Sequence, residues 1–157
     1  MALPSGFAIA NFADHPHLVP VAADRIWTAW WQDSGQLRED VDAHIREMFG
    51  SAGVPFALVA LHEGSFAGVA LAIASDMDER PQYSPWVAAL WVDPIHRGKG
   101  IAGALIEHAV QTMFGQGIRT VYLCSGQQLR PFYQKLGWRV VEDHAGSNDL
   151  VVYSRSQ

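Results

Sequence analysis

The sequence lacks the features that would place it in an oxidising compartment, on a nucleic acid or across a membrane. Cys124 is the only cysteine, so no internal disulfide can form. The sequence has eleven Lys and Arg but sixteen Asp and Glu, and the resulting net charge of -5 disfavours nucleic acid as a partner. The longest strongly apolar run, 66–74, is far shorter than the roughly 18 residues of a membrane span, and the N-terminus has no basic start typical of a secretion signal. We therefore expect a soluble, cytoplasmic protein.

The chain does contain enough apolar material for one folded core. Hydrophobic residues make up 49% of the sequence and charged residues 17%, which is typical of a globular chain. Its 157 residues fit one domain, and no internal repeat or low-complexity run is present. We predict a single domain over residues 1–157.

The first half of the chain predicts two helices followed by a hairpin. After a short apolar start at 7–12, apolar residues recur at helical spacing over 17–31 and again over 36–49. The apolar runs 56–61 and 66–74 are separated by His-Glu-Gly-Ser, which predicts two antiparallel strands joined by a tight turn. The polar segment that follows, up to Pro85, is expected to be a loop.

The second half predicts alternating strands and helices. We expect a central strand at 86–92, a helix at 100–114 and a strand-helix-strand crossover that ends in the strand 120–124. The remaining expected elements are a short helix at 130–136 and strands at 138–141 and 150–153. Together these patterns predict an α/β layered domain with helices packed on a mostly antiparallel sheet.

The most informative segment is the glycine-bearing loop between the strand 86–92 and the helix 100–114. Gly98 and Gly100 allow a sharp turn that aims consecutive backbone amides at one point. The first helical turn adds unpaired N–H groups and the positive end of the helix dipole. Arg97 and Lys99 add full charges, and His96 is a further candidate for phosphate contact. The segment predicts a site for a phosphate or pyrophosphate.

Two other interpretations of this loop stay open. It could be an ordinary connection with solvated cations. Gly98, Gly100 and Gly103 also satisfy G-x-G-x-x-G, so an NAD(P)-binding protein is an alternative. The spacing disfavours that alternative, because no Asp or Glu lies between Glu107 and Glu142 to hold a ribose hydroxyl.

The segment 97–102, Arg-Gly-Lys-Gly-Ile-Ala, resembles the R/Q-x-x-G-x-G/A pattern of the GCN5-related N-acetyltransferases. FYQKLGW at 132–138 is similar to a second element of that family. The resemblance implies a GNAT-like fold whose mixed, mostly antiparallel sheet has about six to seven strands and about four flanking helices. It also implies that acetyl-CoA is the co-substrate. Its pyrophosphate would lie on the amides of Gly98, Lys99, Gly100, Ile101 and Ala102 beside Arg97, and its pantetheine arm would pair with Leu90, Trp91 and Val92.

The resemblance also implies catalytic roles, with two departures from the family pattern. Tyr133 stands at the position of the proposed general acid; without the resemblance it would be a half-buried aromatic. The strand 86–92 carries no carboxylate or histidine, so the base is ordered water or one of the nearest acids, Asp76, Asp78 and Glu79. Gln127 and Gln128 also stand where the family has an asparagine.

Other conspicuous residues have structural as well as functional interpretations. Trp27, Trp30 and Trp31 are expected in the core, although Trp27 and Trp30, with Asp78 and Glu79, are candidates for acceptor contact. Cys124 is expected to be an inert buried thiol, and the seven histidines show no metal-ligand spacing, so no metal is expected.

The sequence thus favours an acetyl-CoA-dependent N-acetyltransferase in which a primary amine, with a small molecule as the expected acceptor, attacks directly in a ternary complex. A non-catalytic acyl-CoA-binding sensor of the same fold is the alternative suggested by the missing base and asparagine. No nucleic-acid or membrane partner is expected, and the family resemblance is compatible with a homodimer.

Overall fold

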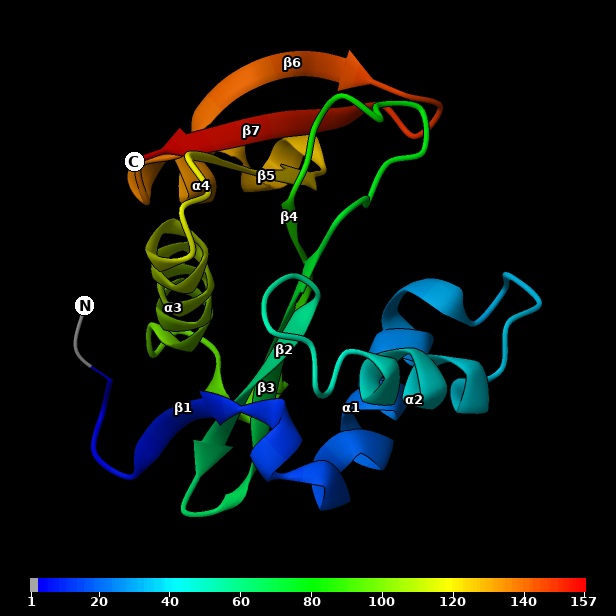
Figure 1. Ribbon diagram of the computed structural model, residues 1–157, viewed down its shortest axis with the longest axis vertical. Coiled ribbons are helices and arrows are strands. Elements are labelled where there is room, and N and C mark those ends of the chain that lie inside the picture. The colour runs from blue at the N-terminus through cyan, green and yellow to red at the C-terminus, as the bar shows by residue number, and fades with distance from the viewer. Residues whose placement is uncertain (1–2) are drawn as a thin grey trace.

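The computed structural model describes residues 3–157 and shows a seven-stranded sheet in the order β1-β2-β3-β4-β5-β7-β6 (Figure 1). Residues 1–2 of the predicted domain lie outside the described part of the chain. Neighbouring strands are antiparallel except β4 and β5, which are parallel. The strands are β1 (Phe7–Asn11), β2 (Phe56–His62), β3 (Ser65–Ile73), β4 (Trp86–Val92), β5 (Thr120–Ser125), β6 (Arg139–Ala145) and β7 (Leu150–Ser156).

Helices cover both faces of the sheet. Figure 1 shows α3 on one side of the central strands and α1 and α2 on the other, which makes three layers. The helices are α1 (Val19–Ile26), α2 (Arg38–Glu47), α3 (Ile101–Gly115) and α4 (Arg130–Lys135). The crossover from β4 through α3 to β5 confirms the single strand-helix-strand unit, and β4 is the fourth of seven strands, as its uninterrupted apolar sequence predicts.

Each face of the sheet carries its own apolar core. On one side, Leu105 and Val110 of α3 are fully buried against the sheet. On the other, Ala22 of α1 and Ile45 of α2 are fully buried against strands β2 and β3. Burying one large aliphatic side chain in this way contributes roughly 1.5–3 kcal/mol. The helical periodicities of the sequence therefore mark the faces that hold the layers together.

The hairpin predicted at 56–74 is confirmed, with β2 and β3 paired from Phe56 and Ala72 to His62 and Ser65. The two residues of the turn, Glu63 and Gly64, both have positive φ values of 49° and 84°. Positive φ at both central positions is typical of a type I′ turn, whose twist matches that of the flanking strands.

The segment 17–31 differs from the single helix expected. A 3-10 turn at Pro16–Leu18 precedes α1, and a π-helical turn, Trp27–Trp31, follows it. The prediction that all three tryptophans lie in the core is wrong, because Trp30 is 52% exposed and Trp31 is 41% exposed. The wider π turn rotates these side chains away from the stripe that a 3.6-residue period would bury.

Strand β6 is longer than the expected 138–141. Its C-terminal half contains Glu142, Asp143 and His144, and polar side chains hide a strand from a search for apolar runs. As the last strand of the sheet, β6 has one free edge in the described residues and tolerates these polar residues. Among residues 3–157, no helix is long and apolar enough to cross a membrane.

Candidate active site

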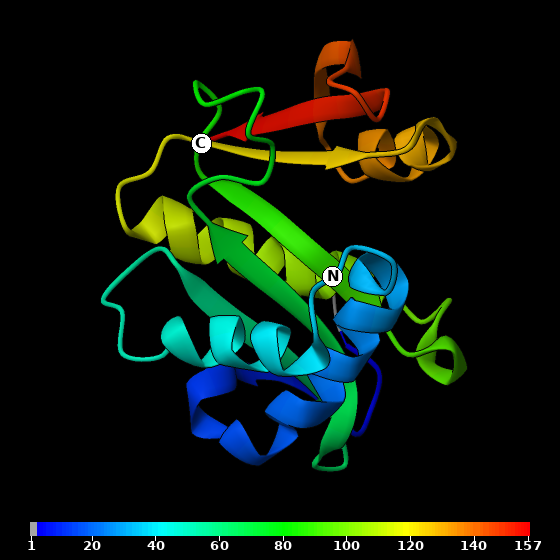
Figure 2. The ribbon, with the colours of Figure 1, turned by 90° about the vertical axis from the view of Figure 1, so that its right-hand side faces the viewer.

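The sheet opens between its two central parallel strands. β4 pairs with β5 only at Trp86 and Tyr122, whereas its other edge pairs with β3 as far as Val92. Figure 2 shows β4 in green and β5 in gold diverging from their one paired position. Leu90, Trp91 and Val92 therefore present, toward β5, backbone that has no strand partner in the described part of the chain. An extended ligand could pair with this edge as an added strand.

A β-bulge lies on β4 immediately before this open edge. The register moves from Ala88 opposite Leu71 to Trp91 opposite Val69, so that Ala89 and Leu90 together face Ala70. Ala89 has a φ of 51°, a left-handed conformation that is uncommon for a residue with a Cβ. Bulges redirect backbone groups and interrupt pairing, and strained backbone of this kind clusters at functional sites.

The predicted phosphate loop forms the far end of the same opening. Gly98 and Gly100 have φ values of 77° and 82°, and Gly100 is the N-cap of α3, so both positions adopt a left-handed conformation that glycine takes without strain. A cavity of about 250 Å³ lies here, where β4 ends and α3 begins. It is lined by Val92, His96, Arg97, Gly98, Gly100, Ile101, Ala102, Gly103 and Phe132.

The two cations of the loop make contacts within the protein. Arg97 Nε donates a hydrogen bond to the Val92 carbonyl at 2.8 Å, and its guanidinium lies 4.6 Å from the ring centroid of Trp91. Lys99 Nζ lies 5.6 Å from the ring centroid of Phe7, and Lys99 does not line the cavity. In this conformation the loop therefore provides free space, backbone amides and the N-terminus of α3 for an anion. The charged groups of Arg97 and Lys99 are engaged in contacts within the protein.

Among residues 3–157, His96 is the one residue of the cavity wall whose side chain has a buried polar atom without a hydrogen-bond partner. It is 8% exposed, packs against the rings of Phe7 and His62, and its Nδ1 atom is buried without a partner. A buried polar atom without a partner is uncommon in folded proteins, and a polar ligand in the cavity would provide one. The residues present thus fit a phosphate-bearing ligand.

Tyr133 lies on α4, on the α3 side of the sheet, with 6% of its surface exposed. Burial is the main cause that raises its pKa to about 12, and the neighbouring Tyr153 and Cys124 add to the rise. The ring centroids of Tyr133 and Tyr153 are 5.2 Å apart. The phenol is therefore protonated throughout the neutral range, as a proton donor must be.

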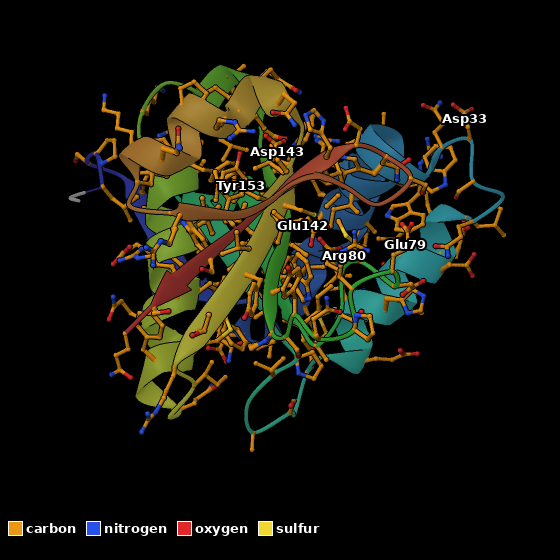
Figure 3. All side chains as sticks on the ribbon, turned by 90° about the horizontal axis from the view of Figure 1, so that it is seen from above. Asp33, Glu79, Arg80, Glu142, Asp143 and Tyr153 are labelled. Atoms are coloured by element: carbon orange, nitrogen blue, oxygen red, sulfur yellow. The ribbon has the colours of Figure 1, made fainter. Side chains whose placement is uncertain are left out.

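The acidic loop between β3 and β4 is tied to the β6–β7 hairpin (Figure 3). Arg80 Nε donates to both carboxylate oxygens of Glu142 at 2.9 Å, and the Tyr83 hydroxyl donates to the same carboxylate at 2.9 Å. The Glu79 carboxylate accepts from the backbone N–H of Ser147 at 3.1 Å. Asp78 is exposed. In residues 3–157, no hydrogen bond joins Asp78 or Glu79, the two acids predicted for acceptor contact, to the tryptophans.

The predicted acceptor tryptophans have different surroundings. Trp27 Nε1 donates to the Gln36 carbonyl at 2.6 Å and lies under the Arg38 guanidinium, so its contacts hold the chain after α1 in place. Trp30 is exposed and meets Trp91 of β4 edge to face, with 6.4 Å between ring centroids. Trp30 thus connects the π turn to the strand at the opening.

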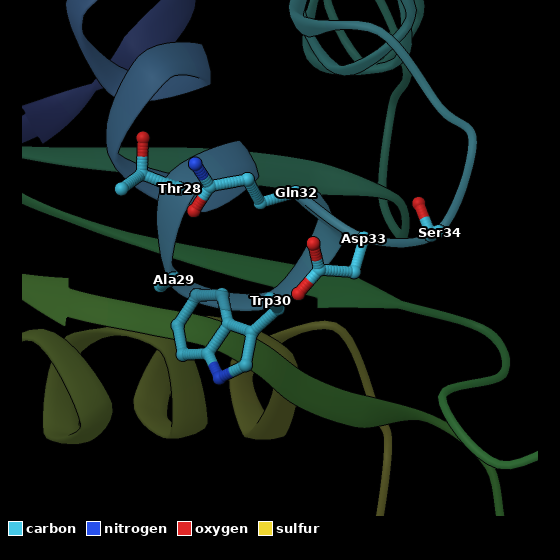
Figure 4. Close-up of a pocket in the computed structure, with 6 residues that line it drawn as sticks. All are labelled: Thr28, Ala29, Trp30, Gln32, Asp33 and Ser34. Carbon is cyan, nitrogen blue, oxygen red and sulfur yellow. The ribbon is translucent and has the colours of Figure 1, made fainter.

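A hollow of about 330 Å³ lies beside Trp30. Figure 4 shows the Asp33 carboxylate pointing toward the Trp30 side chain. Its lining residues are Thr28, Ala29, Trp30, Gln32, Asp33 and Ser34. Sequence reasoning missed Asp33, because a single acid in a polar connection carries no pattern. It also missed the β4 bulge, since the strand contains no glycine that would mark one.

Solved structures share this architecture over nearly the whole chain. An aminoglycoside 6'-N-acetyltransferase complexed with coenzyme A aligns with a TM-score of 0.75 at 17% identity, covering 95% of this chain and 96% of its own. An N-acetyltransferase from Staphylococcus aureus Mu50 gives 0.73 at 20% identity, covering 97% and 99%. An acetyltransferase from Streptococcus agalactiae 2603 gives 0.72 at 12% identity, covering 98% and 100%. At these identities the likeness shows the fold.

The sequence itself shows the family. The model of the acetyltransferase (GNAT) family matches residues 22–138, which run from α1 through the π turn, the open edge of β4 and the glycine loop to the end of the FYQKLGW segment. That match spans well over half of the chain, and it includes the elements that build the opening. The chain belongs to the GNAT family of acetyltransferases.

Proposed function

We propose that this protein is an acetyl-CoA-dependent N-acetyltransferase acting on a primary amine of a small molecule. The carrying observation is the continuity of the open edge of β4 with the cavity at the N-terminus of α3. An extended arm that ends in a pyrophosphate matches this combination of an unpaired strand edge and an anion site. Family membership supports acetyl transfer, and the kind of acceptor is our own inference.

Different parts of this chain would hold different parts of the co-substrate. The backbone of Leu90, Trp91 and Val92 would pair with the pantetheine arm, and the amides from Gly98 to Ala102 would receive the pyrophosphate. His96 Nδ1 could become a hydrogen-bond partner for a polar ligand atom in the same cavity. Acetyl-CoA supplies the thioester from which the acetyl group is transferred.

The reaction forms a C–N bond and breaks a C–S bond, so the sulfur that leaves needs a proton. Tyr133 is our candidate for the group that supplies it, because its pKa of about 12 keeps the phenol protonated. Phe132, the residue before it, lines the phosphate cavity, which places this turn of α4 beside the expected co-substrate.

The surface around Trp30 supports a cationic amine as the acceptor. An exposed indole offers a cation–π contact worth roughly 0.5–1 kcal/mol, and the Asp33 carboxylate lies in the same hollow. Trp30 also contacts Trp91, whose backbone belongs to the edge proposed to hold the pantetheine arm. An amine held by these groups would lie on the acceptor side of the thioester.

The test is the release of free CoA from acetyl-CoA in the presence of a panel of primary amines, measured with a thiol reagent. We expect at least one cationic amine to accelerate release, and Tyr133→Phe to lower turnover ~100-fold or more, since a general acid typically contributes ~10²–10⁴-fold. Tyr83→Phe is the matched control. It removes a phenol hydroxyl that binds Glu142, and it should leave turnover unchanged.

Binding measurements distinguish this function from its alternatives. Acetyl-CoA binding without release on any amine would favour the sensor interpretation, which the absence of a carboxylate or histidine from β4 supports. Binding of NAD(P) with no affinity for acetyl-CoA would overturn the proposal. An unchanged rate for Tyr133→Phe would remove Tyr133 as the acid and leave the transferase function standing.

A further inference from the structure

Transfer to an amine needs a base that β4 does not contain. An alkyl amine with a pKa near 10.4 is neutral in only about one molecule in 2,500 at pH 7, so a bound ammonium must lose a proton before it attacks. The strand that holds the bulge, Trp86–Val92, is WVAALWV and has no titratable side chain. The base must therefore come from a neighbouring element or from water.

We propose that Asp76 is the general base of the acetyl transfer. This inference rests on the proposed function and adds to it the residue that deprotonates the acceptor. Asp76 lies three residues beyond the end of β3, and its Oδ2 atom lies 3.5 Å from the Cys124 sulfur, whose thiol donates to it. Cys124 lies on β5 beyond the single pairing with β4, in the part of β5 that faces the opening.

The C-terminal half of β5 relates the position of the proposed base to that of the proposed acid. The contact of the Cys124 thiol with Asp76 lies on the α1 and α2 side of the sheet, where Cys124 packs beside Met77. Tyr133 belongs to the apolar core on the opposite, α3 side of the sheet, together with Leu123, the residue before Cys124. Asp76 and Tyr133 therefore approach the C-terminal half of β5, which borders the opening, from opposite faces of the sheet.

Glu142, Asp143 and Glu79 have partners that make them poor bases. Hydrogen bonds from Arg80 and Tyr83 lower the pKa of Glu142, and those from Gln127 and Arg130 lower the pKa of Asp143 to about 2. The Glu79 carboxylate holds the Ser147 backbone. In residues 3–157, Asp78 has no hydrogen bond toward β5.

The surroundings of Asp76 suit proton transfer. The residue is exposed, so it can exchange protons with water, yet protein atoms crowd its carboxylate. That desolvation raises its pKa to about 6, while the hydrogen bond from Cys124 acts in the opposite direction. In the described residues, Cys124 is the one side chain that hydrogen-bonds this carboxylate. A base whose pKa lies just below the working pH is ionised and still accepts a proton readily.

The proton balance of the step is complete with these two residues. The bound ammonium gives one proton to Asp76, which passes it to water. The neutral nitrogen forms the C–N bond to the acetyl carbon, the C–S bond breaks with its electron pair on sulfur, and Tyr133 protonates the thiolate. The second proton lost by the nitrogen restores Tyr133. The products are the amide, free CoA and one proton in solution.

The test is the pH dependence of kcat/KM for acetyl-CoA with the best amine of the panel. For the natural sequence we expect activity to fall on the acid side with a midpoint of about 6. Asp76→Asn should lower the rate ~100-fold at pH 7 and lose that limb, and its rate should rise toward pH 10 as the free amine becomes neutral. Asp76→Glu should restore part of the rate together with the acid limb.

Two further variants separate a catalytic role from a structural one. Asp14→Asn makes the same change at an exposed aspartate of the 3-10 turn Phe12–Asp14 and should behave like the natural sequence. Cys124→Val removes the thiol hydrogen bond that lowers the pKa of Asp76, so the acid limb should move to higher pH. An Asp76→Asn profile matching that of Asp14→Asn would overturn the assignment while leaving the transferase function intact. If no amine accelerates CoA release, both the proposed function and the base fail.

Discussion

The close approach of β3 and β4 at Gly68 gives a sharp test of the architecture around the site. Gly68 pairs with Val92, and a Cβ placed on it would lie 2.7 Å from the Trp91 carbonyl oxygen. The same Cβ would lie 3.3 Å from Leu105 of α3. The nearest obstacle is strand backbone, which cannot rotate away as a side chain can. Gly68→Ala must therefore push β4 and α3 away from β3.

The expected loss follows from two opposing effects. Overpacking of this kind costs about 1–3 kcal/mol, while replacing glycine by alanine lowers the entropy of the unfolded chain and returns about 0.4–1 kcal/mol. The net loss is about 1–2 kcal/mol, which for a chain of this size lowers Tm by ~2–8 °C. Urea unfolding followed by tryptophan fluorescence measures it directly, and KM for acetyl-CoA should rise because Trp91 lies on the open edge.

Gly115→Ala is the matched control. Gly115 is the last residue of α3, and a Cβ there would meet nothing within 4 Å, so the same chemical change should stabilise the protein by about 0.5–1 kcal/mol. If Gly68→Ala is as stable as the natural protein while Gly115→Ala gains stability, the tight packing between β3 and β4 is refuted.

Three further predictions concern the core, the surface and the phosphate loop. Leu105 is fully buried, so Leu105→Ala should cost about 2.7–5 kcal/mol in urea unfolding, and a loss below ~1 kcal/mol would contradict its place in the core. Hydrogen bonds from Gln127 and Arg130 lower the pKa of Asp143 to about 2, so its contribution to stability is present above its ordinary pKa of 3.8 and is lost as the pH falls toward 2. The unfolding midpoint of Asp143→Asn should therefore lie below that of the natural protein at pH 7 and converge with it near pH 2. Gly98 has a φ of 77° with open space around it, so Gly98→Ala should cost about 1–2 kcal/mol in stability, and calorimetry should show acetyl-CoA binding weakened by a larger factor than at Gly115→Ala.

Most of the fold could be predicted because the spacing of apolar residues within each short segment indicates whether it forms a helix or a strand. The strand 86–92 coincides with β4, and the helix 36–49 contains α2. The π turn could not be predicted, since Trp-Thr-Ala-Trp-Trp is also compatible with a continuous α-helix, and the contact of Trp30 with Trp91 joins residues far apart in the sequence.

The candidate site could likewise be predicted only in part. The glycine loop was predictable because backbone geometry makes an anion site and glycine marks that geometry in the sequence. Side-chain contacts were not, because they depend on residues distant in the chain. Arg97 folds onto Val92 and Trp91 of the strand before it, and the thiol that Asp76 meets is 48 residues further along. Cys124 was expected to be buried; it is half-buried, although its raised pKa of about 12 agrees with an inert thiol.

The single pairing between β4 and β5 divides the sheet into a four-stranded and a three-stranded part that share one rung, with α3 packed against both. An extended ligand arm bound between the two parts would pair with the unpaired backbone and hold the two parts together while it is bound. Binding of the arm should then slow amide hydrogen exchange in both strands that border the opening, β4 and β5. A molecule bound only in the hollow beside Trp30 should leave amide exchange in these two strands unchanged.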